Sequence, residues 1–181
     1  MSDRQAEAVI AEIASNPYAD PTLYETVMAF GAQIGMPDEG VEVGLMLADA
    51  ERSKGNLDEA MQMYGMMLAS APKNIEAMIG LTHCLLEADL PEQAYLLASA
   101  VIVSDYFRPD GHILSAKANT MNGHFDDAET DLQVVLDMAK KAGDGKLELI
   151  AGKLLRENRK AEEEALAFEV DASDDELVAE G

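Results

Sequence analysis

Apolar residues recur along most of this chain at the spacing of amphipathic helices, not at the alternation expected of strands. Leu23, Val27, Phe30 and Ile34 illustrate the pattern, because they fall at positions i, i+4, i+7 and i+11. Proline, glycine and asparagine divide the pattern into segments of helical length. The sequence therefore predicts an all-α protein.

These segments predict two N-terminal helices, three central helical hairpins and one C-terminal helix. The two N-terminal helices are expected within residues 1–36, where Asp20 and Pro21 begin the second helix and Gly35 ends it. The C-terminal helix is expected in 143–167, with Asp144 as its cap. Its buried face is expected to consist of Leu147, Ile150, Leu154 and Leu155. The six central helices are expected at residues 38–53, 57–71, 75–88, 91–105, 109–122 and 125–142.

The three hairpins, within 37–142, repeat with a period of 34 residues. A turn residue and two small residues recur at equivalent places in each repeat. The turn residues are Gly55, Asp89 and Gly123, and the small residues are Ala48 with Ala60, Thr82 with Ala94, and Ala116 with Ala128. Antiparallel helices need a short turn between them, and small side chains allow them to cross closely. Each small pair therefore predicts where the two helices of one hairpin approach each other.

A 34-residue repeat with small residues at its eighth and twentieth positions resembles the tetratricopeptide repeat. The resemblance covers about residues 41–142 in three copies, and the first copy also has Tyr64 and Pro72 in place. The family's large aromatic residue at position four is absent, since Gly44, Met78 and His112 stand there. The resemblance implies a helical solenoid in which the N-terminal helices cover one end and the C-terminal helix covers the other.

Local strings also resemble the translocator chaperones of bacterial type III secretion (class II). The strings are GLTHC from Gly80 to Cys84, Asp105 with Pro109, and NGHFDDAE from Asn122 to Glu129. The N-terminal helices, the low aromatic content and the long acidic tail depart from that family's pattern. The resemblance implies a cytoplasmic chaperone that binds apolar segments of a secreted protein.

Proteins of the tetratricopeptide-repeat superfamily bind peptides along the concave face that the first helix of each repeat forms. Carried over to this sequence, the resemblance implies a client-binding groove made by Leu45, Asp49, Arg52, Ile79, His83, Leu86, Ile113, Lys117 and Met121. Its apolar members would suit an extended apolar segment of a client, and methionine could repack around different side chains. The alternative for each residue is packing inside the repeats.

Composition narrows the partners to proteins or peptides. The chain has 35 acidic and 13 basic residues and a net charge of −22, which disfavours binding to nucleic acid or to anionic lipid surfaces. No apolar run is long enough to predict insertion into a membrane. A single cysteine, Cys84, excludes an internal disulfide and fits a reducing cytoplasm.

Motifs for catalysis or cofactor binding are not found in the sequence. His83, His112 and His124 lack metal-ligand spacing, and no glycine-rich phosphate loop is present. Cys84 falls on a packing face of a helix and is interpreted as a small buried apolar residue. The sequence therefore predicts neither an enzyme nor a bound cofactor or metal.

Two further hypotheses remain open from the sequence. A general scaffold or assembly factor for another protein complex would need the same groove, and the N-terminal helices could support a homodimer. Residues 168–181 are acidic with scattered apolar residues and predict a disordered tail. That tail could guard the groove by laying Phe168 or Leu177 against apolar surface.

Overall fold

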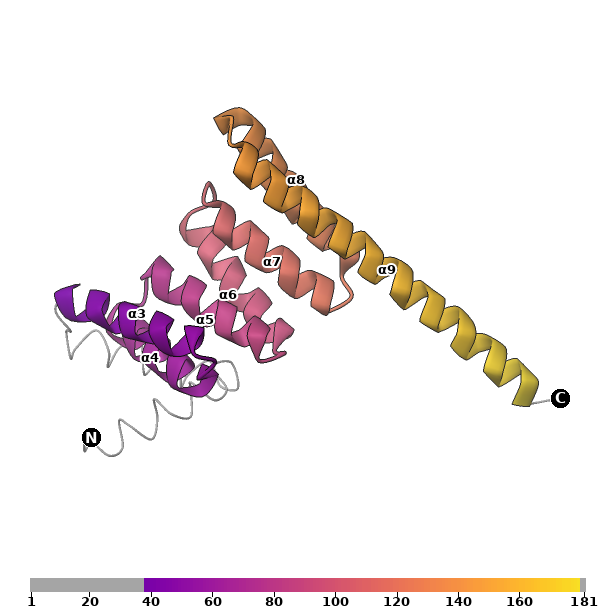
Figure 1. Cartoon of the computed structure of the whole chain (residues 1–181), viewed down its shortest axis with the longest axis horizontal. Helices are drawn as coiled ribbons and strands as arrows, with labels where there is room; N and C mark the ends of the chain where they lie inside the picture. The colour runs from indigo at the N-terminus through magenta and orange to yellow at the C-terminus, as the bar shows by residue number, and fades with distance from the viewer. Residues whose placement is uncertain (1–37, 180–181) are drawn as a thin grey trace.

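A computed structural model describes residues 38–179, with side chains described for 41–168, as a succession of α-helices without strands. Figure 1 shows the helices following one another as antiparallel hairpins, with the long last helix at one end. The helices are α3 (Asp38–Ser53), α4 (Leu57–Ser70), α5 (Ile75–Glu87), α6 (Pro91–Ser104), α7 (Pro109–Met121), α8 (Phe125–Ala142) and α9 (Gly145–Ala179). The all-α prediction is confirmed, and the six central helices agree with their predicted bounds to within one residue. The helices predicted in residues 1–36 lie outside the described residues.

Turns recur at the same point of each hairpin for a local reason. Gly55, Asp89 and Gly123 all have positive φ, of 84°, 59° and 77°, which reverses the chain after the first helix. Between hairpins, the side chain of Asn74 caps α5 by accepting a hydrogen bond from the backbone N–H of Ala77 at 2.8 Å. None of the helices in the described range is long and apolar enough to cross a membrane.

Small residues lie where the helices of each hairpin meet. The three predicted pairs are almost completely buried, at 0% or 1% exposure: Ala48, Ala60, Thr82, Ala94, Ala116 and Ala128. Larger apolar side chains, among them Tyr64, Leu85 and Val101, form one core cluster with the alanines of the first two pairs, and Leu132 forms a second cluster with Ala116 and Ala128. The prediction of close approach at these positions agrees with this burial.

The first helices of successive hairpins lie next to one another. Close contacts join α3 to α5, α5 to α7, and α7 to α9, whereas within residues 38–179 none joins α4 to α6 or α6 to α8. One side of the solenoid is therefore formed by α3, α5, α7 and α9. The opposite side is formed by α4, α6 and α8.

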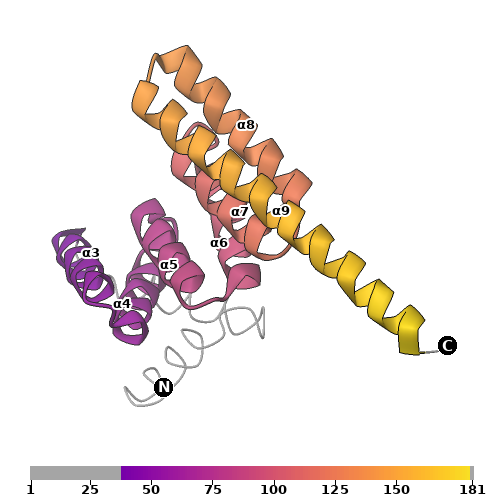
Figure 2. The ribbon, with the colours of Figure 1, turned by 45° about the vertical axis from the view of Figure 1, so that its right-hand side comes forward.

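The last helix both closes the solenoid and extends beyond it. Asp144 caps α9, because its Oδ1 accepts hydrogen bonds from the backbone N–H groups of Lys146 and Leu147 at 3.1 and 3.0 Å. The first part of α9 packs along α8, and its C-terminal part projects away from the other helices in both views (Figures 1 and 2). The sequence placed the end of this helix at residue 167 and a disordered tail at 168–181. The structure corrects this boundary, because the same helix continues to Ala179.

The buried face of α9 differs in part from the sequence prediction. Leu154 and Leu155 pack against the core formed by Ala116, Ala128 and Leu132, as expected. Ile150 is 40% exposed, and the neighbouring Ala151 is fully buried instead. A small residue is required there because α9 lies close against α8.

A candidate peptide-binding groove

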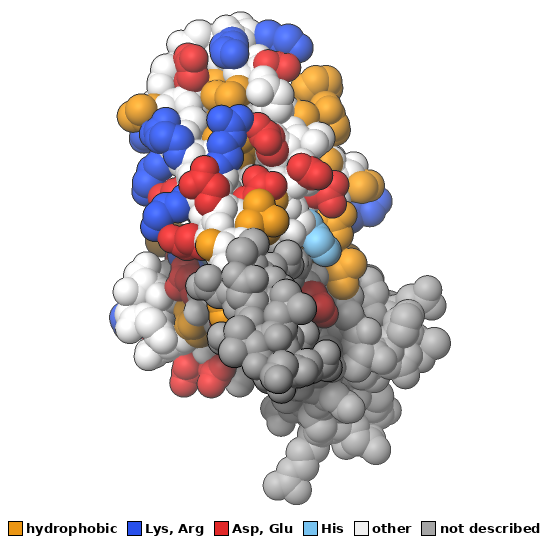
Figure 3. Space-filling view, turned by 90° about the vertical axis from the view of Figure 1, so that its right-hand side faces the viewer, with side chains coloured by type: hydrophobic (Ala, Val, Ile, Leu, Met, Phe, Trp, Pro, Cys, Tyr) orange, Lys and Arg blue, Asp and Glu red, His pale blue; other side chains and the backbone are white. Residues whose placement is uncertain are grey.

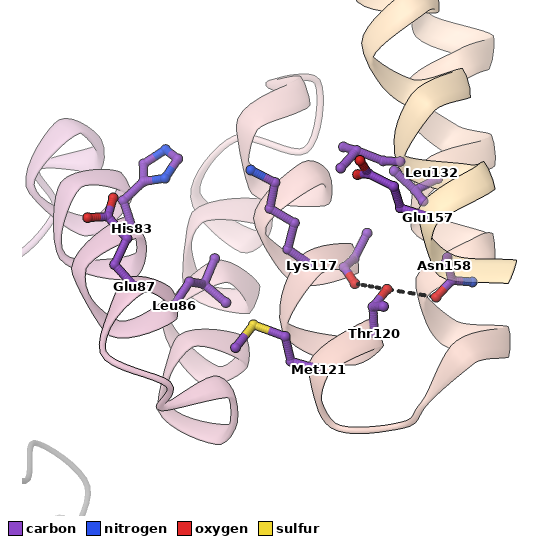
Figure 4. Close-up of a pocket in the computed structure, with 11 residues that line it drawn as sticks. His83, Leu86, Glu87, Lys117, Thr120, Met121, Leu132, Glu157 and Asn158 are labelled. Carbon is purple, nitrogen blue, oxygen red and sulfur yellow. Dashed lines mark hydrogen bonds between the residues drawn. The ribbon is translucent and has the colours of Figure 1, made fainter. Parts of the chain in front are cut away.

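A groove of about 350 Å³ opens on the side of the solenoid formed by the first helices, between α5, α7 and α9 (Figure 4). We call it the concave groove. It is lined by His83, Leu86 and Glu87 of α5, by Ala116, Lys117, Thr120 and Met121 of α7, by Leu132 of α8, and by Leu154, Glu157 and Asn158 of α9. A groove of this volume accepts one or two side chains of a bound segment.

Apolar side chains enter this groove from both ends. Leu86 and Met121 point toward each other from α5 and α7 in Figure 4, and Leu132 and Leu154 line the part nearer α9. Met121 is 44% exposed, so part of its apolar surface is open to a ligand. Methionine has three rotatable bonds and can adapt to ligands of different shape.

One end of the groove is held by a hydrogen-bond network around Asn158. This side chain is only 1% exposed. Its Oδ1 accepts a hydrogen bond from Thr120 Oγ1 at 2.7 Å, and its Nδ2 donates to the backbone carbonyl of Phe125 at 2.9 Å. Asn158 therefore joins α9 to α7 and to the start of α8.

One cation, Lys117, and two carboxylates, Glu87 and Glu157, line the groove. The Lys117 side chain extends into the space between α5 and α9 (Figure 4), and no ion pair to it is found in the described part of the chain. Arg52 of α3 pairs with Glu87 at 2.8 Å. Burial lowers the pKa of His83, and the charges of Arg52 and Lys117 lower it further. The imidazole in the groove is therefore neutral at neutral pH.

Four of the nine residues predicted to bind a client line this groove, namely His83, Leu86, Lys117 and Met121. A fifth predicted residue, Arg52, does not line the groove itself but forms an ion pair with Glu87, which does. Asp49 lies on the exposed surface of α3, where its Oδ1 accepts a hydrogen bond from Tyr64 Oη at 2.5 Å. The structure thus brings four of the predicted residues together on the α5 and α7 walls of one groove, and their binding of a client stays a prediction.

The remaining three predicted residues are more buried than a groove floor would be. Ile79 is 9% exposed and belongs to the core, so the expectation that it offers an open apolar surface is corrected. Leu45 is half-buried and packs against the same core. Ile113 is half-buried and does not line the groove. Packing inside the repeats was the alternative considered for each of them.

Sequence reasoning did not assign the α9 wall of the groove to binding. Leu154 was recognised only as part of a capping face, and Glu157 and Asn158 were not identified. Their contribution follows from the position of α9, which lies beside α7 as the first helix of a fourth repeat would. The apolar periodicity of α9 could have suggested this, but no fourth repeat signature accompanies it.

The structure also bears on two other sequence interpretations. Cys84 is fully buried, as expected for a packing residue, and burial raises the pKa of its thiol to about 11. The tail was expected to guard the groove through Phe168 or Leu177. Phe168 of α9 is 75% exposed, so it does not cover the groove in this structure. The side chain of Leu177 lies outside those described.

Comparison with known proteins agrees with the repeat fold. Residues 51–118 match the family model described as tetratricopeptide repeat. No curated protein matches the chain significantly.

Among solved structures, PcrH from Pseudomonas aeruginosa is 21% identical, with a TM-score of 0.64 over 69% of this chain and 96% of that one. PcrH in complex with the chaperone binding region of PopD is 20% identical, with a TM-score of 0.64 over 70% and 96%. The type III secretion translocator chaperone SycD from Yersinia enterocolitica is 17% identical, with a TM-score of 0.64 over 72% and 91%. At these identities the likeness shows a shared fold, and the predicted tetratricopeptide-repeat solenoid is confirmed.

Proposed function

We propose that this tetratricopeptide-repeat solenoid is a chaperone that holds an apolar segment of a secreted type III translocator protein in its concave groove. The observation that carries the proposal is the groove itself, in which Leu86, Met121 and Leu154 surround an open space between α5, α7 and α9. Apolar pockets along a helical face suit side chains of an extended or helical client segment. The shared fold with PcrH, which has been crystallised with the chaperone binding region of PopD, supports the same assignment.

The charge of the protein supports a chaperone that works in solution. A net charge of −22 keeps the chain and its complexes apart through mutual repulsion, which protects an apolar client from aggregation. The single cysteine is buried and free, which fits a reducing compartment. We therefore propose that the complex forms in the cytoplasm before the client is exported.

The first test is to identify the client. Tagged full-length protein is recovered from its native cells, and the bound proteins are identified by mass spectrometry. One dominant secreted protein with apolar helices is the expected result. A set of resident proteins from another complex would overturn the secretion proposal and favour the scaffold or assembly role.

The second test locates binding in the groove. The double variant Leu86→Glu with Met121→Glu places two charges among the apolar side chains, and client affinity should fall at least tenfold, or about 1.4 kcal/mol. The matched control is Leu149→Glu, because Leu149 is 70% exposed on α9 and does not line the groove. Titration of labelled client peptide is compared between variants with unchanged circular dichroism. Equal affinity in the double variant and wild type would show that the client binds elsewhere.

A further inference from the structure

A second groove lies on the opposite side of the solenoid, where α6 and α8 flank α7. Both flanking helices pack on α7. The groove has two parts, of about 340 and 470 Å³, and Tyr95, Asn119 and Asp127 line both. We call it the back groove. It shares no lining residue with the concave groove, so the two can be occupied at the same time.

The floor of the back groove is polar at positions that are apolar in the preceding repeat. Ser115 and Asn119 stand 34 residues after Leu81 and Leu85, which are core residues with 7% and 2% exposure. Ser115 and Asn119 are buried to the same degree, at 2% and 3% exposure. The third repeat has therefore replaced two core leucines with a hydroxyl and an amide without exposing those positions.

Neither of these polar side chains has a hydrogen-bond partner in the described part of the chain. The other buried polar residues all have one: Thr82 donates to the carbonyl of Met78 at 2.7 Å, His112 lies 2.9 Å from Asp131, and Asn158 bonds as described above. The polar atoms of both side chains keep some access to the groove, because Arg52 Nε is the only fully buried side-chain nitrogen or oxygen without a partner among the described residues. Polar side chains that face a groove without a protein partner are free to form hydrogen bonds with a ligand.

The walls of the back groove indicate the chemistry of that ligand. Asp127 and Asp131 line it from α8, and no lysine or arginine lines either part. Asp131 is paired with His112, whereas Asp127 makes no ion pair in the described range. Tyr95 of α6 is 40% exposed, so its ring is available for contact. The groove thus offers a carboxylate, an amide carbonyl and an aromatic surface, all of which favour a cation that donates hydrogen bonds.

We propose that the back groove binds a polypeptide partner, distinct from the client, through an arginine side chain. The guanidinium carries five hydrogen-bond donors in a planar fork and also stacks on aromatic rings. It could therefore donate to the Asp127 carboxylate and to the side-chain carbonyl of Asn119 while it stacks on the ring of Tyr95. The aliphatic part of the arginine would lie along Ile102 and Val103, which line the same groove. Because this site shares no residue with the concave groove, one molecule would hold its client and a second protein at the same time.

The probe for this site is the peptide acetyl-Ala-Ala-Arg-Ala-Ala-amide, added to ¹⁵N-labelled full-length protein. The matched control peptide has citrulline in place of arginine, which keeps the shape and removes the charge. We expect saturable NMR shifts at the Asn119 side-chain amide and at backbone amides of α6 and α8, with at least tenfold weaker binding of the citrulline peptide. No saturable shift there, equal binding of both peptides, or shifts only at the concave groove would overturn the proposal.

Two variants separate a binding site from a packing defect. Asn119→Leu restores the residue of the preceding repeat, and it should abolish the arginine-dependent shifts while raising the melting temperature. Asp127→Asn changes an exposed residue in the first turn of α8 and should reduce arginine binding at least tenfold while lowering the melting temperature by no more than a few degrees. Unchanged arginine binding in Asp127→Asn would contradict the proposal, even if Asn119→Leu failed to fold.

Discussion

Asn158 shows how one polar side chain can hold three helices together. It is the only asparagine in the part of α9 that packs on the solenoid, and it is 1% exposed. Both of its polar atoms are hydrogen-bonded, one to Thr120 of α7 and the other to the carbonyl of Phe125 at the start of α8. Because both bonds are shielded from water, losing the side chain would leave buried groups without partners.

At this scale we predict that Asn158→Ala lowers the free energy of unfolding by about 1–3 kcal/mol, the cost of unsatisfied buried polar groups together with a small cavity. Urea denaturation followed by circular dichroism measures the change. Lys160→Ala is the control, because the Lys160 side chain is 74% exposed and its removal should change stability by no more than about 0.5 kcal/mol. Similar losses in both variants would mean that the network around Asn158 contributes nothing specific.

Among the elements, α9 combines two segments with different physical roles. Its first part buries Ala151 and Asn158, and Leu154 and Leu155 pack on the core beneath. From Glu163 to Phe168 every side chain is exposed, and Leu166 is 56% exposed. Isolated helical segments are only marginally stable in water, so the projecting part gains little from the solenoid.

We therefore predict that removing residues 165–181 leaves the melting temperature of the solenoid within about 1 °C, because the side chains described in that stretch, 165–168, are all exposed. Circular dichroism should report less helix and the same unfolding midpoint. A chain ending at Gly152 is the comparison, since it also loses Leu154, Leu155 and Asn158 and should melt at least about 4 °C lower. A large drop on removing 165–181 would show that the projecting part contacts the solenoid.

Charge is distributed unevenly over the whole molecule. Seven of the 13 basic residues lie between positions 140 and 160: Lys140, Lys141, Lys146, Lys153, Arg156, Arg159 and Lys160. Figure 3 shows lysine and arginine side chains gathered toward the end at which α8 meets α9, interspersed with acids. The rest of the chain carries most of the negative charge. Self-repulsion of like charges therefore opposes the compact state.

At this scale we predict that raising NaCl from 20 to 500 mM increases the melting temperature by about 2–5 °C, because salt screens repulsion among 35 acidic residues. Most ion pairs of the described residues lie on partly or fully exposed side chains, so their loss on screening costs little. Thermal unfolding at several salt concentrations tests this. A lower melting temperature in high salt would mean that the ion pairs outweigh the repulsion.

The sequence by itself determined the repeat and its hairpins. The 34-residue period, the turn residues and the small pairs are local signals, and local signals specify where each helix begins and ends. His83 and Lys117, which the family resemblance placed in a binding groove, occupy repeat positions one period apart and lie on the α5 and α7 walls of the concave groove.

Only the tertiary structure decided which of those positions are open and which are buried. Ile79 belongs to the core and Leu86 lines the groove, although both are apolar residues of the same helix, because neighbouring helices cover one and leave the other accessible. The α9 wall depends on contacts between segments far apart in sequence, such as Thr120 with Asn158. The unpaired amide of Asn119 was likewise invisible in the sequence, because burial and the absence of a partner are properties of packing and not of residue type.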